Sequence, residues 1–230
     1  MTDLTSPMGL WLGLLGPDSL EALPTEGLGW LGVDLQHGRY DVADLTGLLR
    51  VARVPVLARA ASQAADHLAR VLDTGVDGVI VPGVESTAQA AALVQAVRFP
   101  PEGVRSTGVT RSVLTGGPAR PLLLPMVETR GALDDVEAIA SLPGVDGVFV
   151  GPYDLSLSLA RPSVVDDEVV GAIGRVHRAA REAGVLCGAF SGNRDLDPLL
   201  PADLDLVAVD TDVSVVREGA RAVLERRVRR

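Results

Sequence analysis

The sequence contains no lysine, so all 21 residues counted as Lys or Arg are arginines. A mechanism that runs through a lysine Schiff base is therefore excluded, because it needs a side-chain amine. The chain also has a single cysteine, Cys187, which cannot form an internal disulfide. Its apolar, strand-like surroundings predict that the thiol packs in the interior and takes no part in chemistry.

Aromatic residues are scarce as well, at 3% of a chain that is 47% hydrophobic. The core must therefore consist mainly of Val, Leu, Ile and Ala, the residues of buried strands and amphipathic helices in α/β proteins. The formal net charge of −9 opposes binding to phosphate backbones, so we expect no nucleic-acid partner. The one basic cluster, Arg226, Arg227, Arg229 and Arg230, ends a predicted helix, where positive charge suits the helix dipole.

Long hydrophobic runs are missing too. The apolar stretch at residues 8–15 is far too short to span a bilayer, and Asp3 precedes it where a signal peptide would carry basic residues. We therefore expect no membrane partner and a cytoplasmic location. No Ser/Gly-rich or strongly charged tract divides the chain, so residues 1–230 are expected to form a single domain.

Short Val/Leu/Ile runs alternate along the chain with longer segments whose apolar residues recur at helical spacing. The strand candidates are residues 9–14, 30–35, 56–59, 78–81, 122–127, 147–150, 185–190 and 206–209. The helix candidates are residues 19–26, 42–51, 62–74, 87–97, 131–142, 167–183, 195–200 and 212–226. Asp41 and Ser86 are expected to cap helices at their start, and Gly75 and Gly184 to end them.

One heptapeptide pattern occurs twice, as Gly75-Val76-Asp77-Gly78-Val79-Ile80-Val81 and as Gly144-Val145-Asp146-Gly147-Val148-Phe149-Val150. Each copy joins a helix stop to a buried strand, which is the repeating unit of a parallel sheet. Eight such units in this length predict a (β/α)8 TIM barrel. A nucleotide cofactor is not supported, because no Gly-x-Gly-x-x-Gly segment opens a helix and no P-loop occurs.

The carboxyl ends of barrel strands converge on one face, so polar residues directly after each apolar run are informative. Those residues are Asp34-Leu35-Gln36-His37-Gly38, Arg59, Glu128-Thr129-Arg130 and Gly151-Pro152-Tyr153-Asp154. Each has a structural explanation by itself: Asp154 could cap a helix, Glu128 could pair with Arg130, and Asp34 could hold a turn. Together they predict a binding site, because burying several charges is costly unless they bind something.

Two carboxylates on neighbouring strands, without a Cys/His cluster, suit a hard cation such as Mg²⁺ or Mn²⁺. Water and substrate would complete the coordination. An arginine beside the ion can bind a substrate carboxylate, and His37 is the only histidine placed to move protons there. The other two, His67 and His177, fall within predicted helices and are expected to serve packing or the surface.

An ordered set of short motifs extends over nearly the whole chain. They are Gly29-Trp30, Asp34-Leu35-Gln36-His37-Gly38, Arg59, Asp73, Val81-Pro82, Arg98-Phe99-Pro100-Pro101-Glu102-Gly103-Val104-Arg105, Glu128-Thr129-Arg130, and the second Gly-Val-Asp copy with its continuation Gly151-Pro152-Tyr153-Asp154-Leu155-Ser156. In this order they resemble the HpcH/HpaI aldolases. These metal-dependent enzymes include 4-hydroxy-2-oxoheptanedioate aldolase and 2-dehydro-3-deoxyglucarate aldolase.

The resemblance implies roles for the residues named above. Glu128 and Asp154 would bind a divalent metal, namely Mg²⁺, Mn²⁺ or Co²⁺. Arg59 would bind the 2-oxo acid, with Gly151, Pro152 and Tyr153 also at the substrate. His37, oriented by Asp34, would be the acid/base group, and Asp73 would reach the site of a neighbouring subunit. The expected assembly is a homo-oligomer, a hexamer or trimer, often formed by exchange of the last helix.

The reaction implied is reversible cleavage of a 4-hydroxy-2-oxo acid into pyruvate, or a similar 2-oxo acid, and an aldehyde. Two departures from the family bear on the substrate. The segment 106–120 is shorter than usual, and Tyr153 stands where a small residue is usual, so its ring could narrow the aldehyde pocket. The alternatives are a lyase of the citrate lyase β or malyl-CoA lyase type, and a non-catalytic barrel acting as a binding or scaffold subunit.

Overall fold

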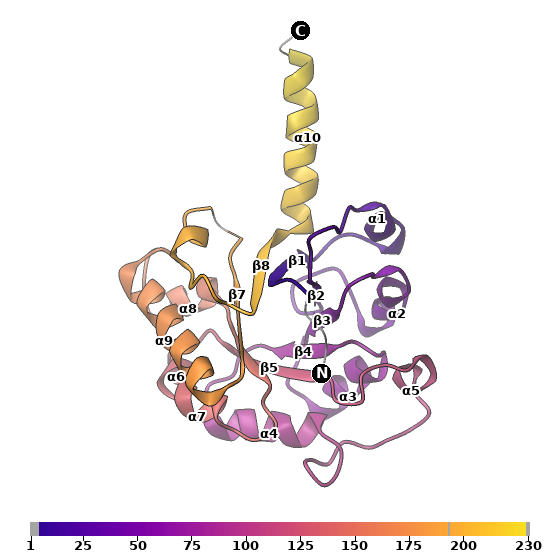
Figure 1. Ribbon diagram of the computed structural model, residues 1–230, viewed down its shortest axis with the longest axis vertical. Helices are drawn as coiled ribbons and strands as arrows, with labels where there is room; N and C mark the ends of the chain where they lie inside the picture. Colours follow the sequence, from indigo (N-terminus) through magenta and orange to yellow (C-terminus); the bar gives the residue numbers. More distant parts are fainter. Residues whose placement is uncertain (1–4, 193, 229–230) are drawn as a thin grey trace.

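The computed structural model describes residues 5–192 and 194–228. Eight strands form a closed parallel barrel in chain order, and β8 pairs with β1 (Figure 1). They are β1 (Met8–Leu12), β2 (Trp30–Asp34), β3 (Val56–Arg59), β4 (Gly78–Val81), β5 (Leu122–Val127), β6 (Gly147–Val150), β7 (Leu186–Phe190) and β8 (Leu206–Thr211). The predicted (β/α)8 fold is confirmed, and the bounds of β3 to β6 are those predicted.

Helices surround the barrel. They are α1 (Pro17–Ala22), α2 (Val42–Val51), α3 (Ala65–Asp73), α4 (Thr87–Val97), α5 (Arg111–Thr115), α6 (Arg130–Asp134), α7 (Val136–Ala140), α8 (Pro152–Ser158), α9 (Asp167–Ala183), the 3-10 turn η1 (Asp197–Leu199) and α10 (Asp212–Val228). The predicted caps Asp41 and Ser86 accept backbone N–H bonds, and Gly75 and Gly184 adopt positive φ at helix ends. His67 and His177 lie in α3 and α9, as predicted.

The structure corrects two of the predicted helical segments and adds a short helix, α5, that was not predicted. Residues 131–142 form two short helices, separated at Asp135, whose carboxylate accepts hydrogen bonds from the N–H and hydroxyl of Thr87. Residues 195–200 form only the single 3-10 turn η1. Helix α5 was not predicted, because five residues are too few to show a helical period.

The barrel interior buries three of the seven aromatic side chains. Trp11, Trp30 and Phe149 pack there as a cluster, with ring centroids 5.7 to 6.4 Å apart. Glycines on adjacent strands make room for these rings: a Cβ at Gly32 would lie 2.5 Å from the Trp11 ring, and one at Gly188 would lie 2.5 Å from Phe149. Aliphatic residues fill the layer between strands and helices, where Cys187 is also buried.

Three aspartates serve the same structural purpose at the amino-terminal end of the barrel. Each directly precedes an even-numbered strand and accepts a backbone N–H bond from near the start of the strand before it. The pairs are Asp77 with Val56, Asp146 with Leu123, and Asp205 with Cys187, at 2.8, 2.7 and 2.9 Å. The repeated Gly-Val-Asp motif therefore supplies a link between neighbouring strands.

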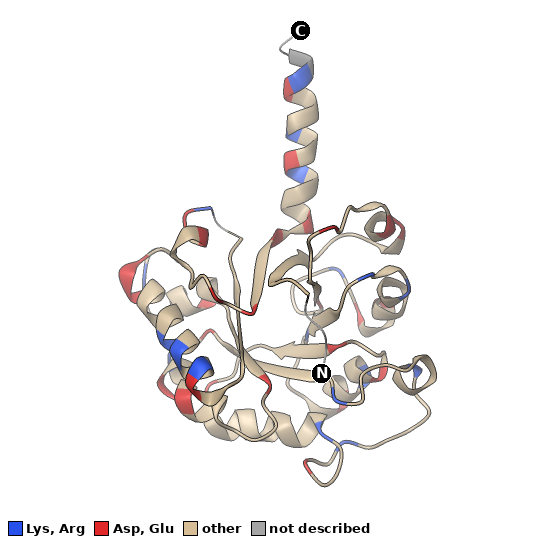
Figure 2. Ribbon diagram, viewed as in Figure 1, with Lys and Arg blue, Asp and Glu red and all other residues tan. Residues whose placement is uncertain are grey.

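Helix α10 projects away from the barrel as a separate rod (Figure 1). Acidic and basic residues are mixed along it (Figure 2). The predicted helix is confirmed and contains Arg226, whereas the side chain of Arg227 and the whole of Arg229 and Arg230 lie outside the described residues. Within the described part of the chain, no helix combines the length and apolar character needed to cross a membrane.

Candidate active site

A cavity of about 260 Å³ opens at the carboxyl ends of the strands. Seven of the eight strands, or the residues directly after them, contribute to its wall. The lining residues are Trp11, Asp34, His37, Arg59, Met126, Glu128, Phe149, Gly151, Pro152, Tyr153, Asp154, Phe190 and Thr211. The structure thus brings together every residue predicted for the site except Asp73.

Asp34 and Arg59 form the most strongly bonded pair of the cavity. They are register partners on β2 and β3, so strand pairing alone places them side by side. The Nε and Nη2 atoms of Arg59 donate to the two carboxylate oxygens of Asp34, at 2.9 and 2.5 Å. Burial by itself would raise the pKa of Asp34, but the hydrogen bonds and charge of Arg59, with backbone N–H groups, hold that pKa below its ordinary value.

Asp34 makes no hydrogen bond to the His37 ring among the described residues, so its predicted role in orienting that ring stays a prediction. Asp34 Oδ1 accepts from the backbone N–H of His37 at 3.1 Å and from that of Gln36 at 3.0 Å, so it holds the turn. Its other acceptor positions go to Arg59 and to Trp11 Nε1, at 3.4 Å. Asp34 therefore positions the guanidinium, while the His37 side chain lies exposed on the cavity wall.

Glu128 is buried, with 6% of its surface exposed, and forms no ion pair with any described residue. Its Oε1 accepts the N–H of Gly83 at 2.6 Å, whereas its buried Oε2 has no hydrogen-bond partner among the described residues. Burial raises the pKa of Glu128, the Gly83 bond opposes the rise, and the negative charge of Asp154 adds to it. The alternative pairing with Arg130 is not formed.

The approach of Glu128 to the next strand depends on Gly151. A Cβ at that position would lie 2.8 Å from Glu128 Oε2, so the carboxylate occupies space that a larger residue would fill. Asp154 is exposed in the first turn of α8 and makes no capping hydrogen bond there, so the alternative role of a helix cap is not observed. Glu128 and Asp154 thus place two carboxylates on one cavity wall.

These two carboxylates fit a hard divalent cation that keeps water and substrate as further ligands. A buried oxygen without a hydrogen bond, beside a second negative charge, is a site where a cation would relieve both penalties. Within residues 5–192 and 194–228, no three His, Cys, Asp or Glu side chains gather closely enough to hold a metal by themselves. The protein could therefore supply only part of the coordination shell.

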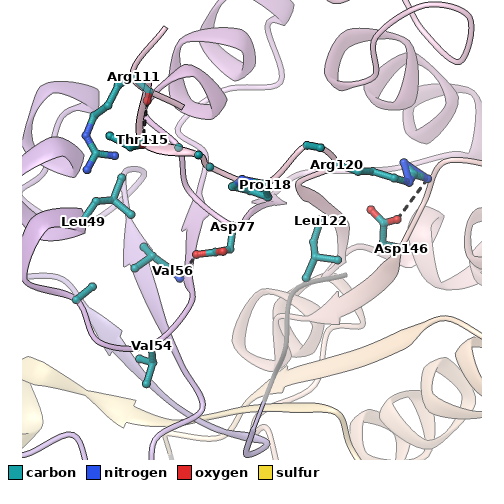
Figure 3. Close-up of a pocket in the computed structure, with 15 residues that line it drawn as sticks. Leu49, Val54, Val56, Asp77, Arg111, Thr115, Pro118, Arg120, Leu122 and Asp146 are labelled. Atoms are coloured by element: carbon teal, nitrogen blue, oxygen red, sulfur yellow. Dashed lines mark hydrogen bonds and ion pairs between the residues drawn. The ribbon is translucent and has the colours of Figure 1, made fainter. Parts of the chain in front are cut away.

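A larger cavity, of about 790 Å³, lies at the opposite end of the barrel under the 106–120 segment (Figure 3). Its carboxylates already serve structural bonds: Asp77 caps the N–H of Val56, and Asp146 binds Leu123 N–H and the guanidinium of Arg98. Arg120 reaches toward Asp146 at 3.4 Å. Despite its size, this cavity lacks the unpartnered carboxylate that marks the smaller one.

Asp73 lies away from the cavity of its own chain. It ends α3, is partly exposed, and accepts a hydrogen bond from Arg105 Nη2 at 2.7 Å. The guanidinium of Arg105 also stacks on the ring of Phe99, 4.8 Å from its centroid. The structure therefore does not bring Asp73 to the other site residues within one chain, and its predicted role at a neighbouring subunit stays a prediction.

Sequence reasoning missed several residues of the site. Trp11 and Phe190 line the cavity, and their centroids are 5.8 Å apart. Thr211 belongs to a part of β8 beyond the predicted strand end. Next to it, fully buried Asp212 accepts backbone N–H bonds from Gly13, Leu14 and Leu15 at 2.8 to 2.9 Å, which fixes the loop after β1. If the eighth strand had been predicted to extend to residue 211, the search for polar residues at strand ends would have found Thr211 and Asp212.

The model of the HpcH/HpaI aldolase/citrate lyase family matches residues 7–222. The chain belongs to this family. It is 33% identical to a pyruvate aldolase from Rhizobium etli, over 96% of this chain and 92% of the relative. It is 36% identical to a hydroxypyruvate/pyruvate aldolase from Sagittula stellata, over 94% and 90% of the two chains.

A solved HpcH/HpaI family structure from Burkholderia cenocepacia covers 98% of this chain and 95% of its own, with a TM-score of 0.86 and 32% identity. The HpcH/HpaI resemblance and the carbon–carbon lyase class predicted from the motifs are thereby confirmed. The protein is an aldolase of the class that works without a Schiff base, as its lack of lysine requires.

Proposed function

We propose that the protein is a divalent-metal-dependent aldolase that cleaves or forms 4-hydroxy-2-oxo acids, with pyruvate or hydroxypyruvate as the 2-oxo acid and an aldehyde as the second substrate. Family membership, together with the pyruvate and hydroxypyruvate/pyruvate aldolases among the relatives, supports the substrate class. The observation that carries the proposal is Glu128 Oε2, which is buried beside Asp154 without a hydrogen-bond partner among the described residues, in a cavity that also holds Arg59.

In this proposal Glu128 and Asp154 hold Mg²⁺, Mn²⁺ or Co²⁺. The bound cation supplies Lewis-acid stabilisation for the negative charge of the enolate that forms when the carbon–carbon bond breaks. Because Asp34 fixes the Nε and Nη2 edge of Arg59, Nη1 is left without a hydrogen bond to the described residues. Nη1 is thus the donor for a carboxylate oxygen of the 2-oxo acid.

His37 moves the proton of the 4-hydroxyl group. In cleavage, the imidazole accepts that proton as the C3–C4 bond breaks and the aldehyde forms, while the bonding electrons remain on C3 as the enolate. Protonation of C3 then completes the 2-oxo acid. In the synthetic direction the imidazole returns a proton to the oxygen of the aldehyde. Its exposed position at the cavity wall allows exchange of that proton with solvent.

The active form is proposed to be a homo-oligomer, a trimer or hexamer, in which α10 packs on a neighbouring copy and Asp73 faces a neighbour's cavity. Two features support this proposal. Helix α10 is exposed on all sides beyond its first turn as far as its side chains are described. Asp73, 39% exposed, lies at the end of the barrel opposite its own cavity, where only another copy could use it in catalysis.

The test is a lactate-dehydrogenase-coupled assay for pyruvate release from a 4-hydroxy-2-oxo acid, with chelator and then with added Mg²⁺, Mn²⁺ or Co²⁺. We expect release only with metal. Isothermal titration should show Mn²⁺ affinity weakened at least ~10-fold in Glu128→Gln and in Asp154→Asn, because each loses an anionic ligand of a hard cation. Asp203→Asn, which alters an exposed carboxylate paired with His177 outside the cavity, is the matched control.

Pyruvate release with chelator present, or unchanged Mn²⁺ affinity in both site variants, would contradict the proposal. The same assay separates the aldolase from its alternatives. A lyase of the malyl-CoA type would need a CoA thioester, and a scaffold subunit would release nothing.

A further inference from the structure

Aromatic side chains are concentrated at the active-site cavity. Only seven of the 230 residues are Phe, Trp or Tyr, yet Trp11, Phe149, Tyr153 and Phe190 line this one cavity. Trp11 and Phe149 form its floor, since they also belong to the packed interior of the barrel. Tyr153 and Phe190 lie nearer the opening, with centroids 6.2 Å apart.

The two outer rings differ in how firmly they are held. Phe190 is confined from behind, because a Cβ at Gly192 would lie 2.2 Å from its ring, and it also meets Trp11 edge-on. Tyr153 is 45% exposed in the first turn of α8, and its hydroxyl makes no hydrogen bond to any described residue. The pair therefore combines a fixed apolar wall with a ring that a substrate can cover.

Charge limits what else the cavity can accept. Arg59, the only arginine among the described residues that line the cavity, is held by Asp34 along one edge, and the carboxylates of Glu128 and Asp154 belong to the proposed metal site. After the carboxylate of the 2-oxo acid has bound at Arg59, the described lining holds no second guanidinium for a carboxylate on the aldehyde.

We propose, on the basis of the aldolase function above, that Tyr153 and Phe190 bind the substituent of the aldehyde. The enzyme then prefers uncharged aldehydes with an aromatic or bulky apolar group over carboxylate-bearing or small hydroxylated ones. In the reaction, C3 of the 2-oxo acid loses a proton and bonds to the aldehyde carbon, whose oxygen takes up a proton. The aromatic pair contacts only the group attached to that carbon.

The test compares kcat/KM for addition of pyruvate to benzaldehyde, 4-carboxybenzaldehyde and glycolaldehyde, with metal present. Benzaldehyde is expected to be favoured over both others. Tyr153→Ala should lower the benzaldehyde-to-glycolaldehyde ratio by roughly 2- to 12-fold, the contribution of one aromatic pair. Tyr153→Phe should keep the ratio, because it keeps the ring. The control is Leu157→Ala, on the exposed side of the same helix, which should leave the ratio unchanged.

A wild-type enzyme that favours 4-carboxybenzaldehyde or glycolaldehyde, or a ratio that Tyr153→Ala does not change, overturns this inference. Deuterium exchange of the pyruvate methyl group in D2O, followed by NMR without aldehyde, tests the aldolase function separately. Exchange in the wild type together with either failing result leaves the aldolase proposal standing and removes the aldehyde preference. Absence of metal-dependent exchange overturns both.

Discussion

At the scale of single residues, the site contains two buried carboxylates whose pKa values shift in opposite directions. Asp34 is bound by a guanidinium and by backbone N–H groups, which offset its burial and lower its pKa. Glu128 has one N–H donor and a nearby negative charge, so burial prevails and its pKa rises. The first arrangement builds a positioned arginine, and the second leaves a negative group poised for a cation.

The unpaired state of Glu128 predicts a gain in stability when its charge is removed. Because the folded-state pKa lies above the ordinary value of 4.5, the protonated form contributes stability that is present below pH 4.5 and lost as pH rises through the folded pKa. At pH 8 and without metal, the free energy of unfolding measured in urea should therefore be about 1 kcal/mol higher for Glu128→Gln than for wild type. The advantage should shrink toward pH 4.5.

Chelator must be present throughout, since bound metal would stabilise only the wild type. Asp203→Asn serves again as the control for loss of an exposed acid. A Glu128→Gln variant that is less stable than wild type at pH 8 would show that Glu128 has a stabilising partner, and the interpretation of Oε2 as an unpartnered atom would fail.

At the scale of elements, the three aspartates that precede β4, β6 and β8 occupy equivalent positions but differ in the interactions through which they stabilise the fold. Asp77 serves one backbone N–H, and burial raises its pKa. Asp146 additionally pairs with Arg98, a side chain only 3% exposed whose other donors bind Pro121 O and Gly144 O. The repeated motif thus carries a shared backbone link, and the second copy adds a buried ion pair.

This difference predicts unequal effects of the same substitution. Asp77→Asn should change the free energy of unfolding by less than about 1 kcal/mol, because an amide oxygen can still accept the Val56 N–H and removal of the buried charge offsets a weaker bond. Asp146→Asn should cost about 3–5 kcal/mol, because it leaves the Arg98 charge buried without its partner. Urea unfolding of both variants provides the comparison. Equal losses would mean that the ion pair contributes nothing beyond the strand link.

At the scale of the whole molecule, the parts of the fold that the sequence predicts are those with local signals. Strands β3 to β6 are short apolar runs bounded by turn residues, so their limits are visible in the sequence. The break at Asp135 depends on a contact with Thr87, 48 positions away, and no local pattern carries it. For the site, polar residues at strand ends indicated Glu128 and Arg59, whereas Trp11 and Phe190 are apolar residues of predicted strands, and nothing local distinguishes them from core residues.

Helix α10 has few contacts within its own chain that could account for its stability. A solitary helix of this length is marginal in water, because most helical stability in proteins comes from packing of an apolar face. Val216, Ala220, Val223 and Leu224 follow the spacing of one helix face, and all four are exposed. Such a face indicates packing against another copy of the chain, in line with the proposed homo-oligomer.

The last prediction tests this packing directly. The double substitution Val223→Glu and Leu224→Glu places two charges on the apolar face, where burial against a partner would be strongly unfavourable. Sedimentation velocity should show a wild-type oligomer and a largely monomeric variant with an unchanged barrel by circular dichroism. Glu225→Arg, which changes charge on the opposite face of the same helix, should leave the oligomer intact. Two outcomes would contradict this prediction: a wild-type chain that sediments as a monomer at micromolar concentration, or a double variant that keeps the wild-type mass. Either would show that the exposed face of α10 does not hold the oligomer together.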